Sequence, residues 1–255
     1  MKVTVLGTGS FVSDLDHLGP GYLLEINDKK ILIDAGSGVQ IQLIKLDIGI
    51  ADLDYIFITH FHPDHTAELY SILVRRFLLG RFYDGQLKDL VVYGPKGVEN
   101  FVREIARIHQ LEIVDKFLKI RFKEITEEAL ETFSVKAFEV KHQVLHKNVD
   151  ALALRFESDN KSVVFSGDTM KCEGIERAIL NADIFIADCS ISKDAPSGPH
   201  LRTNEIGEIS SKQGIKKVIL SHLLPRNYNK NLVGEVKEEF NGEVVLGKDL
   251  MEIEV

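Results

Sequence analysis

The sequence predicts an α/β protein in which two groups of strands are each mixed with helices. Short apolar or β-branched runs, typical of strands, alternate with longer segments whose apolar residues have helical spacing. No Pro/Ser-rich linker separates the two groups, and no repeat of fixed period is present. We therefore expect a single domain over residues 1–255, with two sheets and outer helices.

The first half of the chain divides at Gly-rich or Asn-Asp breaks. The segment 55–59 lacks polar alternation, which is typical of a strand buried on both faces, and it leads directly to His60. Strands are predicted at 3–6, 22–26, 30–34, 55–59 and 90–93, with helices at 66–79 and 98–113.

The second half has the same composition of elements. Strands are predicted at 118–125, 133–140, 151–157, 162–166, 183–188, 217–221, 242–246 and 251–255. Helices are predicted at 172–180, 203–213 and 233–240.

Composition disfavours several classes of protein. The formal net charge of −8 disfavours an extended nucleic-acid surface, without excluding nucleic acid as a partner. No apolar run is long enough for a membrane span, and the N-terminus has no signal-peptide cleavage site, so we expect no membrane association. Cys172 and Cys189 are too far apart for a C-x-x-C pair, which fits a reducing cytoplasm.

A cluster of metal-ligand residue types follows the predicted buried strand. His60, His62, Asp64 and His65 lie within six positions. Residues i and i+2 of an extended segment share a face, so His60 and His62 can bind one metal ion together. Pro63 interrupts the strand, and the following turn can direct Asp64 and His65 to a second ion, as in two-metal hydrolases. A polar loop that is His-rich by chance is the alternative.

The segment Thr59-His60-Phe61-His62-Pro63-Asp64-His65 resembles the T-H-x-H-x-D-H signature of the metallo-β-lactamase superfamily. The resemblance covers nearly the whole chain. Residues 6–10, Leu-Gly-Thr-Gly-Ser, resemble the first strand and turn of its ribonuclease Z branch. It implies a four-layered αββα sandwich with two metal ions at one edge of the sheets. It also implies a supporting role for Asp34, a bridging role for Asp168 and a final ligand at His222.

The resemblance leaves one ligand open, because the family needs a histidine between the signature and Asp168. His142 follows the predicted strand 133–140, whereas His146 lies at a spacing closer to the expected one, and the spacing narrowly favours His146. His200 resembles a histidine that supports the scissile phosphate in the ribonuclease Z branch, although it could also be an ordinary loop residue.

The predicted reaction is hydrolysis by a metal-activated water. The cofactors would be two divalent ions, with zinc expected and manganese or iron as alternatives. Asp64 is the candidate for orienting the nucleophile, and His200 for donating a proton to the substrate. The chain between His142 and Asp168 is too short for the tRNA-gripping arm of ribonuclease Z. We therefore expect a small phosphodiester or related ester as substrate.

Three alternatives remain at this point. An arylsulfatase-like or lactonase-like esterase would use the same ions. A ribonuclease Z-like RNA endonuclease would need another subunit to bind the RNA in place of the missing arm. A non-catalytic protein stabilised by metal is the third. A homodimer is compatible with the family.

Overall fold

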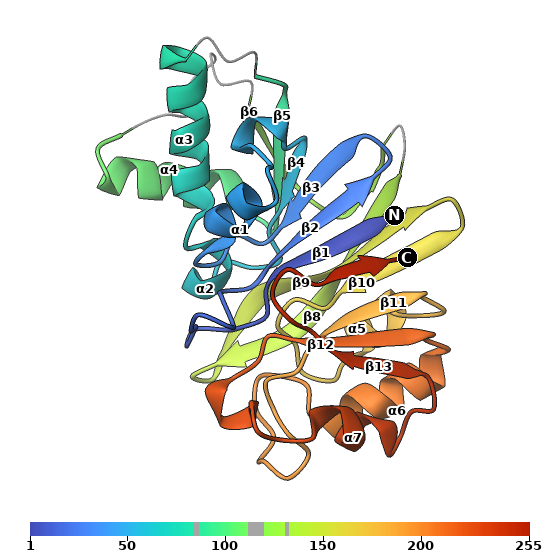
Figure 1. Ribbon diagram of the computed structural model, residues 1–255. Helices are drawn as coiled ribbons and strands as arrows, with labels where there is room; N and C mark the ends of the chain where they lie inside the picture. Colours follow the sequence, from blue (N-terminus) through green and yellow to red (C-terminus); the bar gives the residue numbers. More distant parts are fainter. Residues whose placement is uncertain (84–86, 112–119, 131–132) are drawn as a thin grey trace.

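The computed structural model describes residues 1–83, 87–111, 120–130 and 133–255. In this part of the chain the strands form two seven-stranded sheets that face each other (Figure 1). The first sheet has the order β14 (Glu252–Glu254), β1 (Lys2–Gly7), β2 (Gly21–Ile26), β3 (Lys29–Ile33), β4 (Tyr55–Phe57), β5 (Leu90–Gly94) and β6 (Ile120–Glu124). The second has the order β13 (Glu243–Leu246), β12 (Lys217–Ser221), β11 (Ile184–Asp188), β10 (Lys161–Phe165), β9 (Lys147–Ser158), β8 (Ser134–Val144) and β7 (Glu127–Ala129).

The apolar side chains between the sheets form the central core. Successive residues of a strand point to opposite faces. Thus Ile31 and Ile33 pack between the sheets against residues such as Phe156, whereas Leu32 points outward to the helices. Both faces of each sheet are covered, which explains why strands such as Leu90–Gly94 contain no exposed residue.

Helices cover the outer face of each sheet, so the molecule has the four layers of an αββα sandwich (Figure 1). The first sheet is covered by α1 (Val39–Lys45), α3 (Leu69–Phe82) and α4 (Val98–Ile108). The second is covered by α5 (Glu173–Ala178), α6 (Thr203–Gln213) and α7 (Leu232–Lys237). Among the described residues, the remaining elements are the short α2 (Pro63–Thr66) and two 3₁₀ turns, Ile50–Asp52 and Pro225–Asn227. No helix of the described residues is long and apolar enough to span a membrane.

Most predicted elements are present, with four corrections. The predicted helix 66–79 is broken at residues 67–68 into α2 and α3, because Pro63 starts a separate helical turn. The predicted strands 133–140 and 151–157 form the part of the long hairpin β8–β9 that is far from its turn. The two strands continue beyond the predicted ends, to Val144 and Lys147. Helix α1 is present where no helix was predicted. Helix α4 ends at Ile108, short of the predicted end at 113, and residues 112–113 of that prediction and 118–119 of the predicted strand 118–125 lie outside the described residues.

The ends of several parallel strands lie at the same edge of the sandwich. Strands β3 and β4 are parallel neighbours, and so are β10, β11 and β12. Tyr22 of β2 donates a hydrogen bond from its Oη atom to Ser221 Oγ at the end of β12, at 2.8 Å, and so joins the two sheets at this edge. Loops that follow these strands therefore converge.

Candidate metal centre

The loop after β4 is held rigidly by the aspartate that follows β3. Thr59 donates hydrogen bonds to Asp34 from its backbone nitrogen, to Oδ1 at 2.8 Å, and from its hydroxyl, to Oδ2 at 2.9 Å. Pro63 then starts α2, and the Thr66 hydroxyl donates to the His62 carbonyl at 2.9 Å. A proline at the first helical position fixes the backbone in helical conformation. Asp64 and His65 thus point to a different place from His60 and His62.

A first group of ligand atoms comes from the motif loop, the hairpin and the loop after β10. His60, His62, His142 and Asp168 each offer an atom within 4.8 Å of the others. His142 Nε2 lies 3.2 Å from His62 Nδ1, and His60 Nε2 lies 3.7 Å from Asp168 Oδ2.

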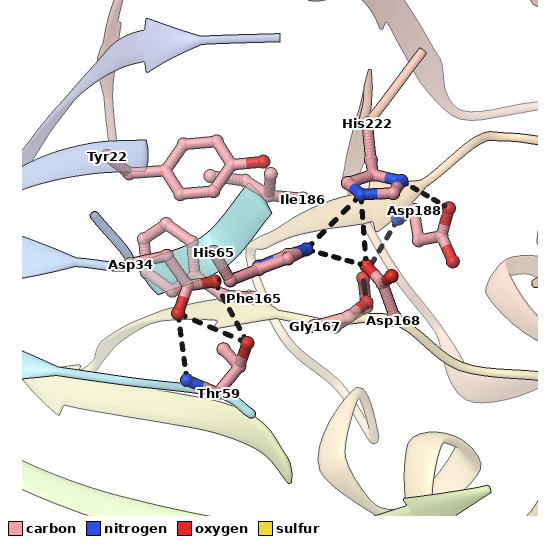
Figure 2. Close-up of a pocket in the computed structure, with 11 residues that line it drawn as sticks. Tyr22, Asp34, Thr59, His65, Phe165, Gly167, Asp168, Ile186, Asp188 and His222 are labelled. Carbon is pink, nitrogen blue, oxygen red and sulfur yellow. Dashed lines mark hydrogen bonds and ion pairs between the residues drawn. The ribbon is translucent and has the colours of Figure 1, made fainter. Parts of the chain in front are cut away.

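A second group shares Asp168 with the first. It contains Asp64, His65, Asp168 and His222, all of them buried. His65 Nε2 lies 3.1 Å from Asp168 Oδ1, and His222 Nε2 lies 3.3 Å from both Asp168 Oδ1 and Asp64 Oδ2. Figure 2 shows the imidazoles of His65 and His222 pointing toward each other and toward the Asp168 carboxylate. Asp168, which was predicted to bridge two ions, thus lies between the two groups.

In three of the imidazoles, the nitrogen that points away from the cluster has a partner that fixes the ring. His65 Nδ1 donates to Asp34 Oδ2 at 2.7 Å (Figure 2), and His142 Nδ1 donates to the Pro199 carbonyl at 3.0 Å. His222 Nδ1 lies 2.8 Å from Ser190 Oγ. Such contacts direct the Nε2 atom of these three rings inward, as in metal sites where a carboxylate or carbonyl orients the histidine.

The electrostatics of the cluster favour positive charge at its centre. Burial alone would lower the pKa of His65, but the carboxylates of Asp168 and Asp34 raise it to about 10. Burial and neighbouring histidines lower the pKa of His60 and His62, so both rings are neutral, the form that binds metal. The buried atoms His60 Nε2 and Asp64 Oδ1 have no hydrogen-bond partner among the described residues. Converging, unpaired donor atoms of N and O type fit two divalent cations.

Two of these residues have unusual backbone conformations. Asp34 and His222 both follow the end of a strand with positive φ, 56° in each case. This left-handed region is uncommon for residues other than glycine and is frequent at functional sites. The turn re-aims both side chains into the cluster instead of continuing the strand.

His200 lies beside the cluster, held by a carboxylate that the sequence had not singled out. His200 Nδ1 donates to Asp188 Oδ2 at 2.7 Å and lies 3.8 Å from Asp168 Oδ2. Burial would lower the pKa of His200, but Asp188 outweighs this effect and raises it. Asp188 also accepts a hydrogen bond from the Ser190 hydroxyl at 2.8 Å. The only sequence signal for Asp188 was its position at the end of the predicted strand 183–188.

The narrow preference for His146 as a ligand is wrong, because the structure brings His142 and not His146 into the cluster. Leu145 and His146 form the two-residue turn of the β8–β9 hairpin, between the paired residues Val144 and Lys147. Both have positive φ, 50° and 64°, as a type I′ turn requires. His146 is exposed at this turn, whereas His142 is buried inside β8.

The sandwich and the two histidine-aspartate groups at its edge define a protein of the metallo-β-lactamase fold, within a superfamily of metallo-hydrolases. The chain belongs to the anti-Pycsar protein Apyc1 family, whose model matches residues 1–240. It is similar to ribonuclease Z of Mycobacterium bovis (strain BCG / Pasteur 1173P2), with 24% identity over 281 residues, covering 100% of this chain and 98% of the relative. It is also similar to the probable metallo-hydrolase YhfI of Bacillus subtilis, with 26% identity and 97% of each chain covered.

Solved structures agree with this fold. The crystal structure of the metallo-β-lactamase fold protein YhfI from Bacillus subtilis has a TM-score of 0.82 at 24% identity and covers 99% of each chain. The short form of human tRNase Z has a TM-score of 0.77 at 22% identity, covering 100% of this chain and 99% of the other. The predicted αββα metallo-β-lactamase fold and the likeness to the ribonuclease Z branch are thus confirmed.

Proposed function

We propose that the protein is a hydrolase that uses two divalent metal ions to cleave a small phosphodiester. The observation that carries this proposal is that three four-residue groups of possible ligands share the Asp168 carboxylate, and that two of them have no other residue in common. His60, His62, His142 and Asp168 would hold one ion. Asp64, His65, Asp168 and His222 would hold the other. Imidazole and carboxylate donors suit zinc best, with manganese or iron as alternatives.

Two bound ions would supply Lewis acidity toward a phosphoryl oxygen and lower the pKa of an attacking water. Residues of the chain would orient the water and transfer protons. Asp64 has a buried Oδ1 atom without a hydrogen-bond partner, so it can orient the water or accept its proton. His200 donates its Nδ1–H to Asp188, which also raises the pKa of His200; in the protonated ring Nε2–H can donate to a non-bridging or leaving oxygen.

Two observations support a small substrate. The chain between His142 and Asp168 consists of the end of β8, a two-residue turn, β9 and β10, without an inserted arm. The net charge of −8 disfavours a long polyanion. The relatives named ribonuclease Z support phosphodiester chemistry over sulfate esters or lactones.

An RNA endonuclease is the second candidate. It is favoured by the ribonuclease Z relatives, which match 100% of this chain. Cleavage of a structured precursor tRNA at a rate above that of a small diester would support this candidate instead.

The test combines elemental analysis with hydrolysis of bis(p-nitrophenyl) phosphate. Asp168→Ala removes the shared ligand. Asp159→Ala removes an exposed carboxylate at the opposite end of β10, in the turn after β9, and is the matched control. We expect two metal ions per chain and activity in the wild type and the control, and loss of both in Asp168→Ala.

Other outcomes would be informative. Two ions without phosphodiesterase activity would refute the substrate class and lead to sulfate esters and lactones. No bound metal after reconstitution with zinc or manganese would refute the central proposal.

A further inference from the structure

The loop between β1 and β2 presents apolar side chains to solvent beside the metal centre. Phe11 is 62% exposed, Val12 56% and Leu15 95%. Exposed large apolar residues that cluster on a surface commonly mark a binding site.

This loop is firmly held, so its exposed side chains do not reflect a loose segment. Asp249 Oδ1 accepts hydrogen bonds from the Thr8 backbone nitrogen and hydroxyl, each at 2.8 Å, and Oδ2 accepts from the Leu18 nitrogen at 2.9 Å. His17 stacks on Tyr228 with ring centroids 3.8 Å apart. Both ends of the loop are therefore fixed, and the segment 11–15 is presented in a defined conformation.

Within this loop, Phe11 adjoins a candidate metal ligand. Its ring centroid lies 6.2 Å from that of His62, at an interplanar angle of 53°. The other nearby phenylalanine, Phe61, is already stacked on Phe101 of α4 at 4.6 Å. Phe11 therefore combines an open face with a place next to the centre.

We propose that Phe11 is a specificity-determining residue. Its ring stacks on a planar ring of the substrate, in the ester group that stays on the phosphate when the leaving group departs. The inference rests on the proposed function and names its substrate class: phosphodiesters with an aromatic or heterocyclic ring close to the phosphate. Stacking on an aromatic side chain tolerates any flat ring, because all such rings have a π face. Since the contact is made in the bound ground state as well as the transition state, it acts on KM.

The experiment uses diesters that share the p-nitrophenolate leaving group and differ in the other arm. Methyl p-nitrophenyl phosphate has no second ring, phenyl p-nitrophenyl phosphate has an aryl ring, and thymidine 5′-(p-nitrophenyl phosphate) has a heterocyclic base. We compare wild type, Phe11→Ala and Phe11→Tyr, which keeps a ring. Phe82→Ala is the control, because Phe82 is 66% exposed but lies at the far end of α3, about 20 Å along the helix from its start.

For Phe11→Ala we expect KM to rise about tenfold, equivalent to about 1.4 kcal/mol, for a ring-bearing diester. The methyl diester should be unaffected, Phe11→Tyr should behave as wild type, and Phe82→Ala should change nothing. A larger effect on the thymidine than on the phenyl diester assigns the site to a heterocyclic base, and the reverse assigns it to an aryl group.

An equal loss on all three diesters would overturn the inference, since Phe11 would then only hold the loop. A change from dimer to monomer in size-exclusion chromatography of Phe11→Ala, with KM unchanged, would also overturn it and assign the surface to a second copy of the chain. If wild type cleaves no diester although it binds metal, the proposed function itself fails.

Discussion

The Nε2 atoms of His65 and His222 lie 3.2 Å apart, although 157 positions separate the two residues in sequence. His65 comes from the helical turn α2 beside the first sheet, and His222 follows β12 of the second sheet. At this distance the lone pairs of two imidazole nitrogens repel each other unless a proton or a metal cation is shared by them. The centre therefore forms only where the two sheets are packed together.

Substitution of His142 should reduce metal content and activity, whereas substitution of His146 should change neither. His142→Ala deletes a donor atom of the first group, so we expect loss of one metal equivalent and more than about 100-fold of activity, since even the partners of metal ligands are worth up to that amount. His146→Ala changes an exposed turn residue and should keep both. Elemental analysis and diesterase assays of the two variants give the comparison. Equal metal content in both would contradict the assignment of His142.

His200→Ala should separate catalysis from metal binding. His200 is placed by Asp188 next to the centre, and a donor to a developing negative charge is worth roughly 100- to 1,000-fold in kcat. We expect a decrease of that size, with the metal content unchanged. The measurement is kcat alongside elemental analysis of the same preparation. A variant that loses metal in proportion to its activity would make His200 a ligand and not a donor.

The hydrogen bond between Tyr22 and Ser221 should stabilise the fold, and substitutions of its two partners should have non-additive effects on the free energy of unfolding. Both groups are buried, and the bond joins the two sheets. Tyr22→Phe should lower the free energy of unfolding by about 1 kcal/mol, and Ser221→Ala should have a similar effect. The double variant should be hardly less stable than either single one. Urea unfolding of the metal-loaded proteins tests this, and fully additive losses would show that the bond is not what matters.

The pH dependence of stability should include a contribution from Asp183. Burial would raise the pKa of Asp183, but hydrogen bonds from Lys216, at 2.6 Å, and from Ser162 lower it below 3.8. Because the folded-state pKa is depressed, this stabilisation is present above the unfolded-state pKa and is lost as the pH falls through the folded-state pKa. Asp183→Asn should therefore be destabilised relative to wild type at about pH 7, with a smaller difference at about pH 3. A difference that does not shrink on acidification would indicate that packing, not charge, is responsible.

Sequence patterns predicted the parts of the centre that are local. Residues 60–65 contain four ligand types in one short segment, and the strand before them has a continuous apolar pattern, so both could be read without coordinates. Helix α6 and strand β12 have the predicted boundaries for the same reason. Asp34, Asp168 and His222 were found only through the resemblance to a family, because each lies alone after its strand.

The choice between His142 and His146 could not be made locally. It depends on where β8 turns back, and Leu145-His146 lacks the Asn-Gly or Asp-Gly pattern that normally marks a two-residue turn. Asp188 was missed for a different reason, since its importance lies in its contacts with His200 and Ser190 across loops. Contacts of this kind follow from tertiary packing and leave no periodic signal.

The contact of Asp249 with Thr8 and Leu18 has a consequence for the order of events during synthesis. The loop that carries Phe11 is made before its carboxylate anchor, which is separated from Thr8 by 241 positions. Strand β1 likewise pairs with β14. On the ribosome this loop thus has to wait, unanchored, until residue 249 has emerged from the exit tunnel. The rim of the centre consequently takes its final shape only after all strands of the second sheet have been synthesised.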